Sequence, residues 1–404
     1  MNIYISGISG TGMGPLALMA KAAGFNVYGS DLAEGAIYPE LIRSGIEVKI
    51  GLQDGEFLKE KLEGGIDWFV YTSALKSDHP ELEIARASGI KITKRDEFTA
   101  FLIQKLNLKL VAVAGTHGKT TTTSMIVFAA LKLGLPVSYI VGTTLGFALS
   151  GSYKEGDKYF VYEADEYDRN FLNFYPWLAV IPCVSYDHPD IYPTREDYLA
   201  AFEQFKSQSE NIIDEPEDFD FRIAGEARRK DAALAAMAIR KMAPEISAEK
   251  IVEVLNEFPG VGRRFEKLAD GIYTDYAHHP EEIKATIDVA KDEARFNNKS
   301  GVVVVYQPHQ NTRQHEVREG YFDAFDGVDK IYWLPTYLTR ENPDLNILTP
   351  EDLIGGLNDP TKAEAAEIGD DLFKKILDER DSGKLVVLMT AGPADDWLRR
   401  SLSL

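Results

Sequence analysis

Short apolar runs alternate with longer segments of helical length along most of the chain. The runs are rich in valine, isoleucine and leucine, which is typical of strands that are buried on both faces of a parallel sheet. They lie at residues 2–6, 26–29, 68–72, 109–114, 159–163, 178–185, 301–306, 330–334 and 385–389. This alternation predicts an α/β fold in which helices cover parallel sheets.

Two changes in composition divide the chain into three predicted domains. A polar stretch precedes Leu108, and the glycines Gly260 and Gly262 precede Arg263. The predicted domains are 1–106, 107–262 and 263–404. The acidic, sparsely apolar segment 207–220 is predicted to be a loop that leads to a helix beginning near Gly225.

Composition and charge exclude several classes of protein. The chain has 404 residues, 45% of them hydrophobic, and 44 Lys+Arg against 64 Asp+Glu give a net charge of −20. This charge disfavours nonspecific binding to nucleic acid or to anionic membranes. The start of the chain does not read as a signal peptide, and the aliphatic runs are too short to span a bilayer. We therefore expect a cytoplasmic protein without a membrane segment, of undetermined oligomeric state.

The single cysteine, Cys183, also restricts the chemistry. One cysteine allows neither an intramolecular disulfide nor a zinc site built from cysteines. Because Cys183 lies inside the apolar run from Leu178 to Val184, we expect a buried structural thiol.

The first candidate site is the glycine-rich sequence GISGTGMG, from Gly7 to Gly14, between a predicted strand and a predicted helix. Glycines at a helix N-terminus let backbone N–H groups approach a diphosphate. The spacing differs from the dinucleotide pattern G-x-G-x-x-G, so a simple turn remains the alternative. Asp31 ends the second strand, where an acidic residue would meet a ribose hydroxyl.

The second candidate site, KLVAVAGTHGKTTTT at residues 109–123, carries a stronger signal. A lysine at the start of such a helix reaches the β- and γ-phosphates, and the next hydroxyl can bind Mg²⁺. Val113 stands where the usual pattern has a glycine, so the loop is a shortened variant. A capped helix with a solvated lysine is the alternative. The residues that we expect to bind ATP are Gly115, Thr116, His117, Gly118, Lys119, Thr120 and Thr121.

Polar residues follow two further strands and supply candidate metal ligands. Glu163 ends the run KYFVYE, at the sheet edge expected to carry the phosphate loop, and this position favours it over the carboxylates that follow, Asp165, Glu166 and Asp168. Mg²⁺ prefers such oxygen ligands. His188 follows the run at 178–185, where an imidazole could bind a second cation or orient a carboxylate.

The last third of the chain contributes an arginine pair and two histidine-containing segments. Arg263 and Arg264 lie in a glycine-flanked hinge, from which an arginine could reach a γ-phosphate upon domain closure. The segment YQPHQNTR follows another strand and contains His309 together with Arg313, which could bind a carboxylate. A surface arginine pair and a loop cap are the competing interpretations.

These motifs occur in an order that resembles the Mur ligase family of peptidoglycan synthesis. The similarity rests on GISGTGMG, GSD, AGTHGKTTTT, EADEYD, DHPDIY, GRRFE, DYAHHPEE and YQPHQNTR, which extend over nearly the whole chain. The resemblance implies a Rossmann-like UDP-binding domain, a central P-loop ATPase domain and a Rossmann-like C-terminal domain that binds the amino acid.

The resemblance also implies a role for each matching residue. Lys119 and Thr120 would bind ATP and Mg²⁺, Glu163 would bind Mg²⁺, and His188 would bind a second cation. Catalysis would depend on Lys119, His188 and Arg264, and the C-terminal domain would contact ATP through Arg264 and Asp275. The incoming amino acid would meet Tyr276, His309 and Arg313. The UDP part would be held by Gly10, Thr11, Gly12, Asp31 and Ser73.

The chain departs from the family pattern in the segment GEARRKD, residues 225–231. Ala227, Arg228 and Asp231 stand where the family has the His, Asn and Asn that contact adenine. We expect Arg228 to stack on the purine and Asp231 to accept a hydrogen bond from its amino group. The region from Phe205 to Gly225 is shorter than in the family, which predicts a reduced accessory sheet.

The implied reaction is the ATP-dependent ligation of L-alanine to the lactyl carboxylate of UDP-N-acetylmuramate through an acyl phosphate. An alternative within the family uses a recycled murein peptide as the amine. A non-catalytic protein that binds UDP-sugar or nucleotide is the alternative from another class. A nicotinamide dehydrogenase would leave the second loop unexplained.

Overall fold

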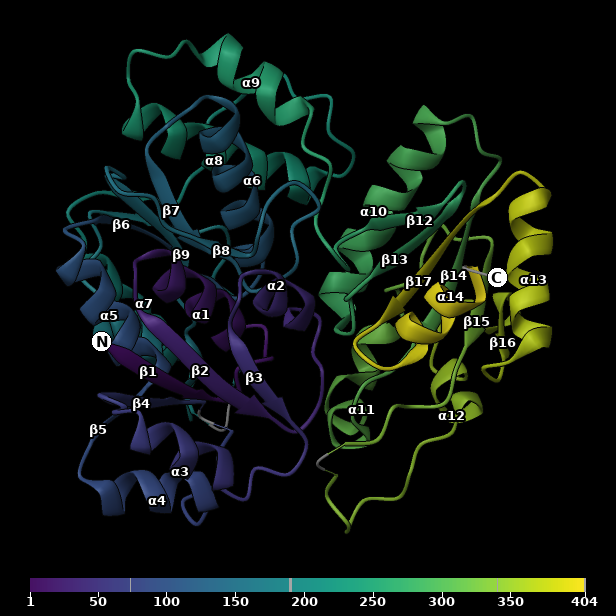
Figure 1. Cartoon of the computed structure of the whole chain (residues 1–404). Coiled ribbons are helices and arrows are strands. Elements are labelled where there is room, and N and C mark those ends of the chain that lie inside the picture. The colour runs from purple at the N-terminus through teal and green to yellow at the C-terminus, as the bar shows by residue number, and fades with distance from the viewer. Residues whose placement is uncertain (73, 189–190, 340, 403–404) are drawn as a thin grey trace. The chain divides into compact units, whose positions relative to one another are not determined.

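The computed structural model describes residues 1–72, 74–188, 191–339 and 341–402, and it contains three β-sheets (Figure 1). The described chain forms two compact units. The first comprises Met1–Phe221 and Lys230–Pro259, and the second comprises Arg222–Arg229 and Gly260–Leu404. Each of the three predicted domains contains one sheet, and the first two sheets share the first unit. The domain boundaries themselves stay a prediction.

The first sheet is fully parallel, with the order β3-β2-β1-β4-β5. Its strand order reverses beside β1, and in open α/β sheets ligands bind at such a switch point. Its strands are β1 (Asn2–Ser6), β2 (Asn26–Asp31), β3 (Glu47–Ile50), β4 (Trp68–Tyr71) and β5 (Lys91–Lys94). The helices of this part are α1 (Met13–Ala22), α2 (Tyr38–Arg43), α3 (Glu56–Glu63), α4 (Pro80–Ser88) and α5 (Arg95–Lys105).

The second sheet has the order β11-β10-β6-β9-β7-β8, and every pairing except β7–β8 is parallel. Its strands are β6 (Lys109–Val113), β7 (Val137–Ile140), β8 (Gly151–Ser152), β9 (Tyr159–Glu163), β10 (Leu178–Val180) and β11 (Ile212–Ile213). The accompanying helices are α6 (Lys119–Lys132), η1 (Tyr167–Asn173), α7 (Arg195–Ser207), α8 (Glu226–Met242) and α9 (Ala248–Asn256).

Strand β8 joins the second sheet to helix α1 of the first sheet. A Cβ atom built at Gly151 would lie 2.0 Å from the carbonyl oxygen of Pro15, so only glycine allows this approach. Nearby, the buried Glu40 of α2 accepts hydrogen bonds from the backbone N and the hydroxyl of Ser150, at 2.8 and 2.7 Å. The two sheets also share one hydrophobic core. The first unit is therefore a single packed body.

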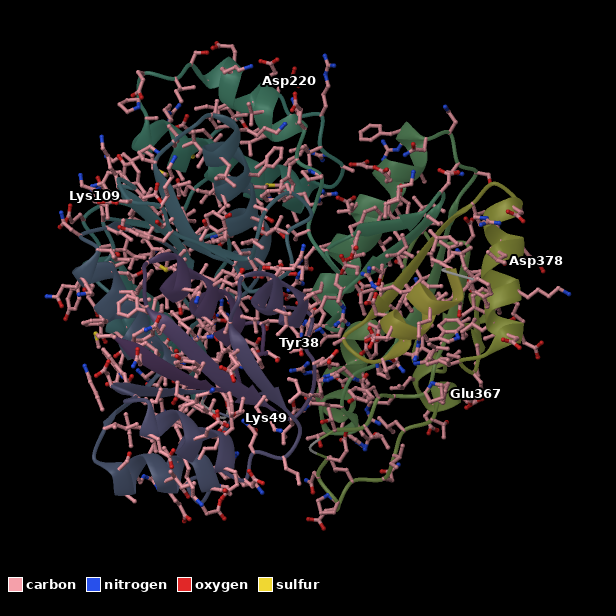
Figure 2. The ribbon with its side chains drawn as sticks, in the orientation of Figure 1. Tyr38, Lys49, Lys109, Asp220, Glu367 and Asp378 are labelled. Carbon is pink, nitrogen blue, oxygen red and sulfur yellow. The ribbon has the colours of Figure 1, made fainter. Side chains whose placement is uncertain are left out.

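The third sheet has the order β12-β13-β17-β14-β15-β16, and only β12 runs antiparallel to its neighbour. Its strands are β12 (Glu266–Ala269), β13 (Ile272–Asp275), β14 (Val302–Gln307), β15 (Lys330–Trp333), β16 (Ala363–Ala365) and β17 (Leu385–Thr390). The helices are α10 (Pro280–Phe296), α11 (Asn311–Val317), η2 (Arg318–Tyr321), α12 (Pro350–Ile354), η3 (Pro360–Lys362), α13 (Asp370–Asp381) and α14 (Ala394–Leu402). Figure 2 shows the side chains on the ribbon, with Asp378 on α13.

The structure confirms the α/β fold with predominantly parallel sheets, and it corrects two local predictions. Strand β10 ends at Val180, well before residue 185, and Pro182 cannot donate to a ladder hydrogen bond. Cys183 therefore lies in an irregular segment and its side chain is exposed, so the prediction of a buried thiol was wrong. The predicted loop at 207–220 contains the short edge strand β11. Within the described ranges, no helix is both long and apolar enough to cross a membrane.

Candidate functional site

The second glycine-rich sequence forms a phosphate loop between β6 and α6. Gly118 precedes the helix with φ of 83°, in the left-handed region that favours glycine. A Cβ atom at this position would lie 2.6 Å from Oδ1 of Asp231 and 2.9 Å from Cβ of Pro182. The backbone N of Thr116 donates to the carbonyl of Cys183 at 2.8 Å. The loop is therefore held closely against the segment that follows β10.

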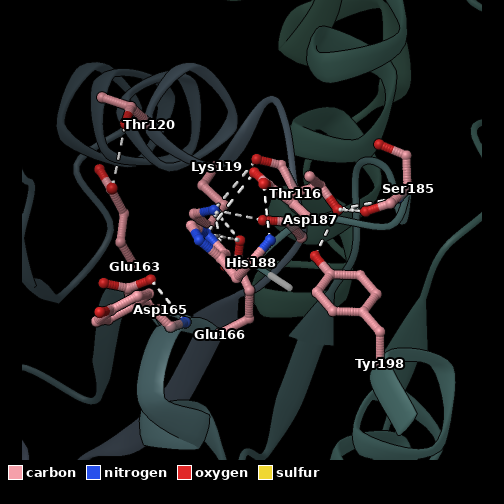
Figure 3. Close-up of polar contacts among 12 residues, drawn as sticks. Thr116, Lys119, Thr120, Glu163, Asp165, Glu166, Ser185, Asp187, His188 and Tyr198 are labelled. Atoms are coloured by element: carbon pink, nitrogen blue, oxygen red, sulfur yellow. Dashed lines mark hydrogen bonds and ion pairs between the residues drawn. The ribbon is translucent and has the colours of Figure 1, made fainter. Parts of the chain in front are cut away.

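Lys119 begins α6, and its ammonium group lies in the centre of a buried polar cluster. It donates to the carbonyl oxygens of Gly115 and Thr116, and it forms an ion pair of 2.8 Å with Glu166 (Figure 3). The Glu166 side chain is only 1% exposed. Burial raises the pKa of Glu166 above its usual value, and the charge of Lys119 opposes this shift. Glu166 was among the carboxylates predicted as candidate metal ligands, but its pairing with Lys119 was not predicted, because the two residues are 47 positions apart in the sequence.

Thr120 and Glu163 form the oxygen pair expected of a magnesium site. The Thr120 hydroxyl donates to Oε2 of Glu163 at 3.1 Å (Figure 3). Oε1 of Glu163 accepts from the backbone N of Gly142 at 3.2 Å. The pairing of β6 with β9 places Val113 opposite Glu163, so the carboxylate stands beside the phosphate loop. A hydroxyl and a carboxylate at a phosphate loop are hard oxygen ligands, which fit Mg²⁺.

His188 lies on the other side of Lys119 and contacts two carboxylates. Its Nε2 is 3.8 Å from Oε1 of Glu166 and 3.7 Å from Oδ2 of Asp187. Its ring meets that of Tyr167 edge to face. His188 thus contacts Glu166 and Asp187, whereas Thr120 contacts Glu163.

Tyr198 supports the base of the phosphate loop. Its hydroxyl is 2.7 Å from the hydroxyl of Thr116, which also donates to the carbonyl of Ser185 and accepts from the Ser185 backbone N. Two other predicted ATP ligands, His117 and Thr121, are half-buried on the same loop and first helical turn.

The altered segment at 225–231 spans the first turns of α8 and the boundary between the two units. Asp231 is buried, accepts a hydrogen bond from the Thr122 hydroxyl at 3.1 Å and lies against Gly118. It therefore stands directly behind the phosphate loop. Arg228 is half-buried and belongs to the second unit.

The first glycine-rich loop lines a cavity of about 710 Å³ in the first unit. Gly10, Thr11, Gly12 and Asp31 are among its lining residues, whereas Ser73 lies outside the described residues. Both carboxylate oxygens of Asp31 accept backbone N–H groups. The same cavity is lined by residues of the loop and η1 helix that follow β9, namely Asp165, Tyr167 and Asn170.

Arg95 is a further residue of this cavity that the sequence analysis did not identify. It begins α5, and its guanidinium group lies against Gly12 of the glycine-rich loop. Its Nε donates to Asp96 at 3.1 Å. A mostly buried guanidinium beside a glycine-rich loop provides a positive charge for an anion. No recognisable motif marks Arg95 in the sequence.

In the second unit, two arginines enclose the ring of Tyr276. The guanidinium groups of Arg263 and Arg264 lie 4.7 and 5.2 Å from the ring centre. Asp275, which we expected to contact ATP, is buried, and its oxygens accept from the backbone N of Phe265 and Ala277 and from the Thr286 hydroxyl. In this structure the Asp275 carboxylate therefore organises the surrounding backbone.

The predicted amino-acid residues of the second unit lie around His278. The ring centre of His278 is 5.4 Å from that of Tyr276 and 5.8 Å from that of His309. Nδ1 of His278 is 3.2 Å from Oε2 of Glu282. Burial lowers the pKa of His278, and the charge of Arg313 acts in the same direction. Tyr276, His278 and His309 thus form one cluster, with Arg313 near enough to act on its electrostatics.

Comparison with known proteins identifies the first two parts of the chain. Residues 2–106 match the model of the Mur ligase family, catalytic domain, and residues 113–254 match the Mur ligase middle domain. A UDP-N-acetylmuramate–L-alanine ligase of Fusobacterium nucleatum is 31% identical over 417 residues, which cover 86% of each chain. One of Clostridium tetani is 31% identical over 453 residues, covering 96% of this chain and 95% of the relative.

Two solved structures have a similar fold. A UDP-N-acetylmuramate–alanine ligase of Thermotoga maritima has a TM-score of 0.79 at 22% identity, with 100% of this chain and 98% of that chain covered. A murein peptide ligase of Psychrobacter arcticus has a TM-score of 0.63 at 22% identity, with the same coverage.

Proposed function

Since this chain belongs to the Mur ligase family, we propose that it joins L-alanine to the lactyl carboxylate of UDP-N-acetylmuramate, using ATP. The class of reaction is that of an ATP-dependent amide ligase of peptidoglycan synthesis. The relatives at 31% identity are named for this reaction and align with most of the chain. We place the reaction in the cytoplasm, where ATP is available.

One observation supports this proposal above the others. The cavity of the glycine-rich loop is lined by Asp165, and the next residue, Glu166, pairs with Lys119 of the phosphate loop. A diphosphate-linked sugar in this cavity would therefore extend toward the phosphates of ATP. This arrangement suits the transfer of a phosphoryl group between two bound substrates.

In the first half-reaction, the lactyl carboxylate oxygen attacks the γ-phosphorus of ATP and ADP leaves, giving an acyl phosphate. Activation is needed because a free carboxylate is a poor electrophile. We assign Lys119 to neutralise charge on the transferring group, with the backbone N–H groups of residues 115–120 around the phosphates. Arg264 of the second unit would add a positive charge in the transition state.

We assign Thr120 and Glu163 to hold Mg²⁺, and His188 to a second cation or to the sugar-acid carboxylate. A bound magnesium ion would neutralise negative charge on the phosphate oxygens. The ATP phosphates would be lined by Gly115, Thr116, His117, Gly118 and Thr121. Arg228 and Asp231 would lie near the adenine base of ATP, and Asp275 would support the structure of the second unit. Gly10, Thr11, Gly12, Asp31 and Ser73 would hold the UDP part.

In the second half-reaction, the amine of L-alanine attacks the acyl carbon, the bond to the phosphate oxygen breaks, and inorganic phosphate leaves. The attacking ammonium group must first lose a proton to a nearby carboxylate or imidazole, for which we propose His188, and the proton that the new amide nitrogen then loses leaves with the phosphate. We assign the carboxylate of the amino acid to Arg313 and His309, with Tyr276 beside them. The lowered pKa of His278 keeps the imidazole of this cluster neutral near pH 7, which avoids repulsion of the ammonium group.

The experiment that tests this function measures phosphate release from ATP in the presence of UDP-N-acetylmuramate and a panel of amines. The panel contains L-alanine, glycine, L-serine and the murein tripeptide, and mass spectrometry identifies the product. We expect the highest kcat/KM with L-alanine. A preference for the tripeptide would support the murein peptide ligase instead, and nucleotide binding without phosphate release would support a non-catalytic binding protein.

A further inference from the structure

The arginine turn, residues 261–266, has an unusual backbone on both sides of Arg264. Arg263 and Phe265 have φ of 57° and 52°, in the left-handed region that non-glycine residues rarely adopt. Such a conformation is unfavourable for a residue with a side chain and persists only where the surroundings determine it. The surroundings of the arginine turn therefore decide where Arg264 points.

Backbone hydrogen bonds fix the turn: the N–H of Arg264 donates to the carbonyl of Val261 at 3.1 Å within it, and three further bonds reach Glu266, Asp275 and Tyr276. The N–H of Arg263 donates to Oε2 of Glu266 at 2.8 Å, and the N–H of Phe265 donates to Oδ2 of Asp275 at 2.7 Å. The carbonyl of Arg263 accepts from the N–H of Tyr276 at 2.8 Å. Two of the three bonds end on a carboxylate, so the orientation of Glu266 and Asp275 sets the turn.

Arg399 of the C-terminal helix α14 holds Glu266 in place. One terminal nitrogen of Arg399 donates to Oε1 of Glu266 at 3.1 Å, and the other donates to Oε2. This bidentate pairing fixes both the position and the plane of the Glu266 carboxylate. Oε2 of Glu266, which accepts from the second terminal nitrogen of Arg399, also accepts a hydrogen bond from the N–H of Arg263.

A second carboxylate holds Arg399 itself. Nε of Arg399 donates to Oδ2 of Asp395 at 2.9 Å, and the hydroxyl of Thr274 donates to Oδ1 at 2.6 Å. Asp395 is 3% exposed, and Nε of Arg263 lies 3.6 Å from its Oδ2. The guanidinium of Arg263 also donates to the carbonyl of Thr390 at 2.9 Å. A continuous set of charged contacts thus extends from α14 to the arginine turn.

We propose that Arg399 is a positioning residue that orients Arg264 for phosphoryl transfer, acting through Glu266. The inference rests on the proposed function, because it takes the role of Arg264 from there. Loss of Arg399 frees the Glu266 carboxylate, which releases the N–H of Arg263 and lets the turn relax from its left-handed conformation. Arg264 then no longer occupies a single orientation at the moment of transfer.

The test compares Arg399→Ala with Arg400→Ala, its neighbour on the same helix, whose Nε donates to the backbone carbonyl of Asp396. We expect kcat to fall between about 10- and 100-fold in Arg399→Ala, the scale of a misplaced catalytic group. KM for ATP should change less than kcat, and Arg400→Ala should match the wild type. Arg399→Lys should recover only part of the loss, because an ammonium group lacks the planar fork.

A double variant separates positioning from general stability. In an Arg264→Ala background, adding Arg399→Ala should cause no further fall in kcat, since the residue through which it acts is gone. An equal fall in both backgrounds, or an unchanged kcat in Arg399→Ala, would overturn the proposal. If Arg399→Ala does not fold, Arg399→Lys in both backgrounds provides the same comparison.

An activity-independent measurement keeps this result distinct from a failure of the proposed function. In protein labelled at arginine, the Nε–H NMR signal of Arg264 is assigned by its loss in Arg264→Ala. This signal should shift or broaden in the Arg399 variants and remain in place in Arg400→Ala. An unmoved signal would overturn the positioning role, whether or not the wild type ligates L-alanine.

Discussion

The Nζ atom of Lys119 lies 2.8 Å from the carboxylate of Glu166, a side chain that is almost completely buried. A charge at this depth needs a partner, since the desolvation of an unpaired carboxylate is strongly unfavourable. Lys119 therefore has a structural partner in addition to its expected role toward phosphate. Any variant of Lys119 changes stability as well as chemistry.

Lys119→Ala should abolish ligation and also lower the free energy of unfolding by roughly 3–5 kcal/mol, because Glu166 loses its counter-charge. The double variant Lys119→Ala/Glu166→Gln should remain inactive but recover much of the stability. Urea unfolding together with the phosphate-release assay checks both parts. Turnover at the wild-type rate in either variant would contradict the assignment of the phosphate loop.

Arg264→Ala should lower kcat far more than it raises KM for ATP. The physical reason is that an arginine acting on charge that develops during transfer contributes little to ground-state binding. Steady-state kinetics with saturating UDP-N-acetylmuramate and L-alanine provide the measurement. Equal changes in kcat and KM would instead indicate that Arg264 binds ATP in the ground state.

Asp231→Asn should reduce the preference for ATP over GTP. A carboxylate can only accept hydrogen bonds, which favours the amino group of adenine and disfavours O6 of guanine, whereas an amide can also donate. Asparagine keeps an oxygen for the hydroxyl of Thr122, so the fold should be preserved. The kcat/KM values for both nucleotides decide the matter. Equal kcat/KM values for ATP and GTP in the wild type would show that Asp231 does not distinguish adenine from guanine.

His278 should make the second unit less stable as the pH falls from 7.5 to 5.5. Burial lowers its pKa below the ordinary 6.5, so the unfolded chain binds the proton more tightly than the folded protein. The free energy of unfolding should decrease as the pH falls through 6.5 and level off below the pKa of the folded state. Each unit of pKa difference corresponds to about 1.4 kcal/mol.

Urea unfolding of the wild type and of His278→Asn at a series of pH values isolates this contribution. The difference in stability between the two proteins should depend on pH in the stated direction. A difference that is independent of pH would show that His278 titrates equally in both states.

The buried central strands were predictable because their sequences are continuous apolar runs. β6, β9, β14 and β17 all lie within a residue or two of the predicted ranges. The edge strands β3 (EVKI) and β5 (KITK) were missed, because their charged residues face solvent and leave too few apolar positions to form a pattern. A continuous apolar run is thus what made a strand recognisable, since the fully buried strands β7 (VSYI) and β13 (IYTD), which are short and contain polar residues, were also missed.

The candidate site was predictable where it follows a local motif. The phosphate loop with Thr120 and Glu163 was recognisable because strand ends of a parallel sheet meet at one edge. The pairing of Glu166 with Lys119 and the position of Arg95 beside Gly12 were not predicted, since both arise from contacts with residues distant in sequence. Cys183 was misjudged because hydrophobic neighbours in sequence do not reveal where Pro182 ends the ladder.

The packing of β8 against α1 gives the first half-reaction an entropic advantage. Because Gly151 brings β8 onto Pro15, the glycine-rich loop and the phosphate loop belong to the same compact unit. A sugar substrate and ATP that are bound to such a unit have already lost most of their freedom to tumble relative to one another. Their encounter then resembles a reaction within one molecule, for which effective concentrations reach about 10⁵–10⁸ M. A side chain larger than glycine at residue 151 would loosen this alignment without touching either substrate.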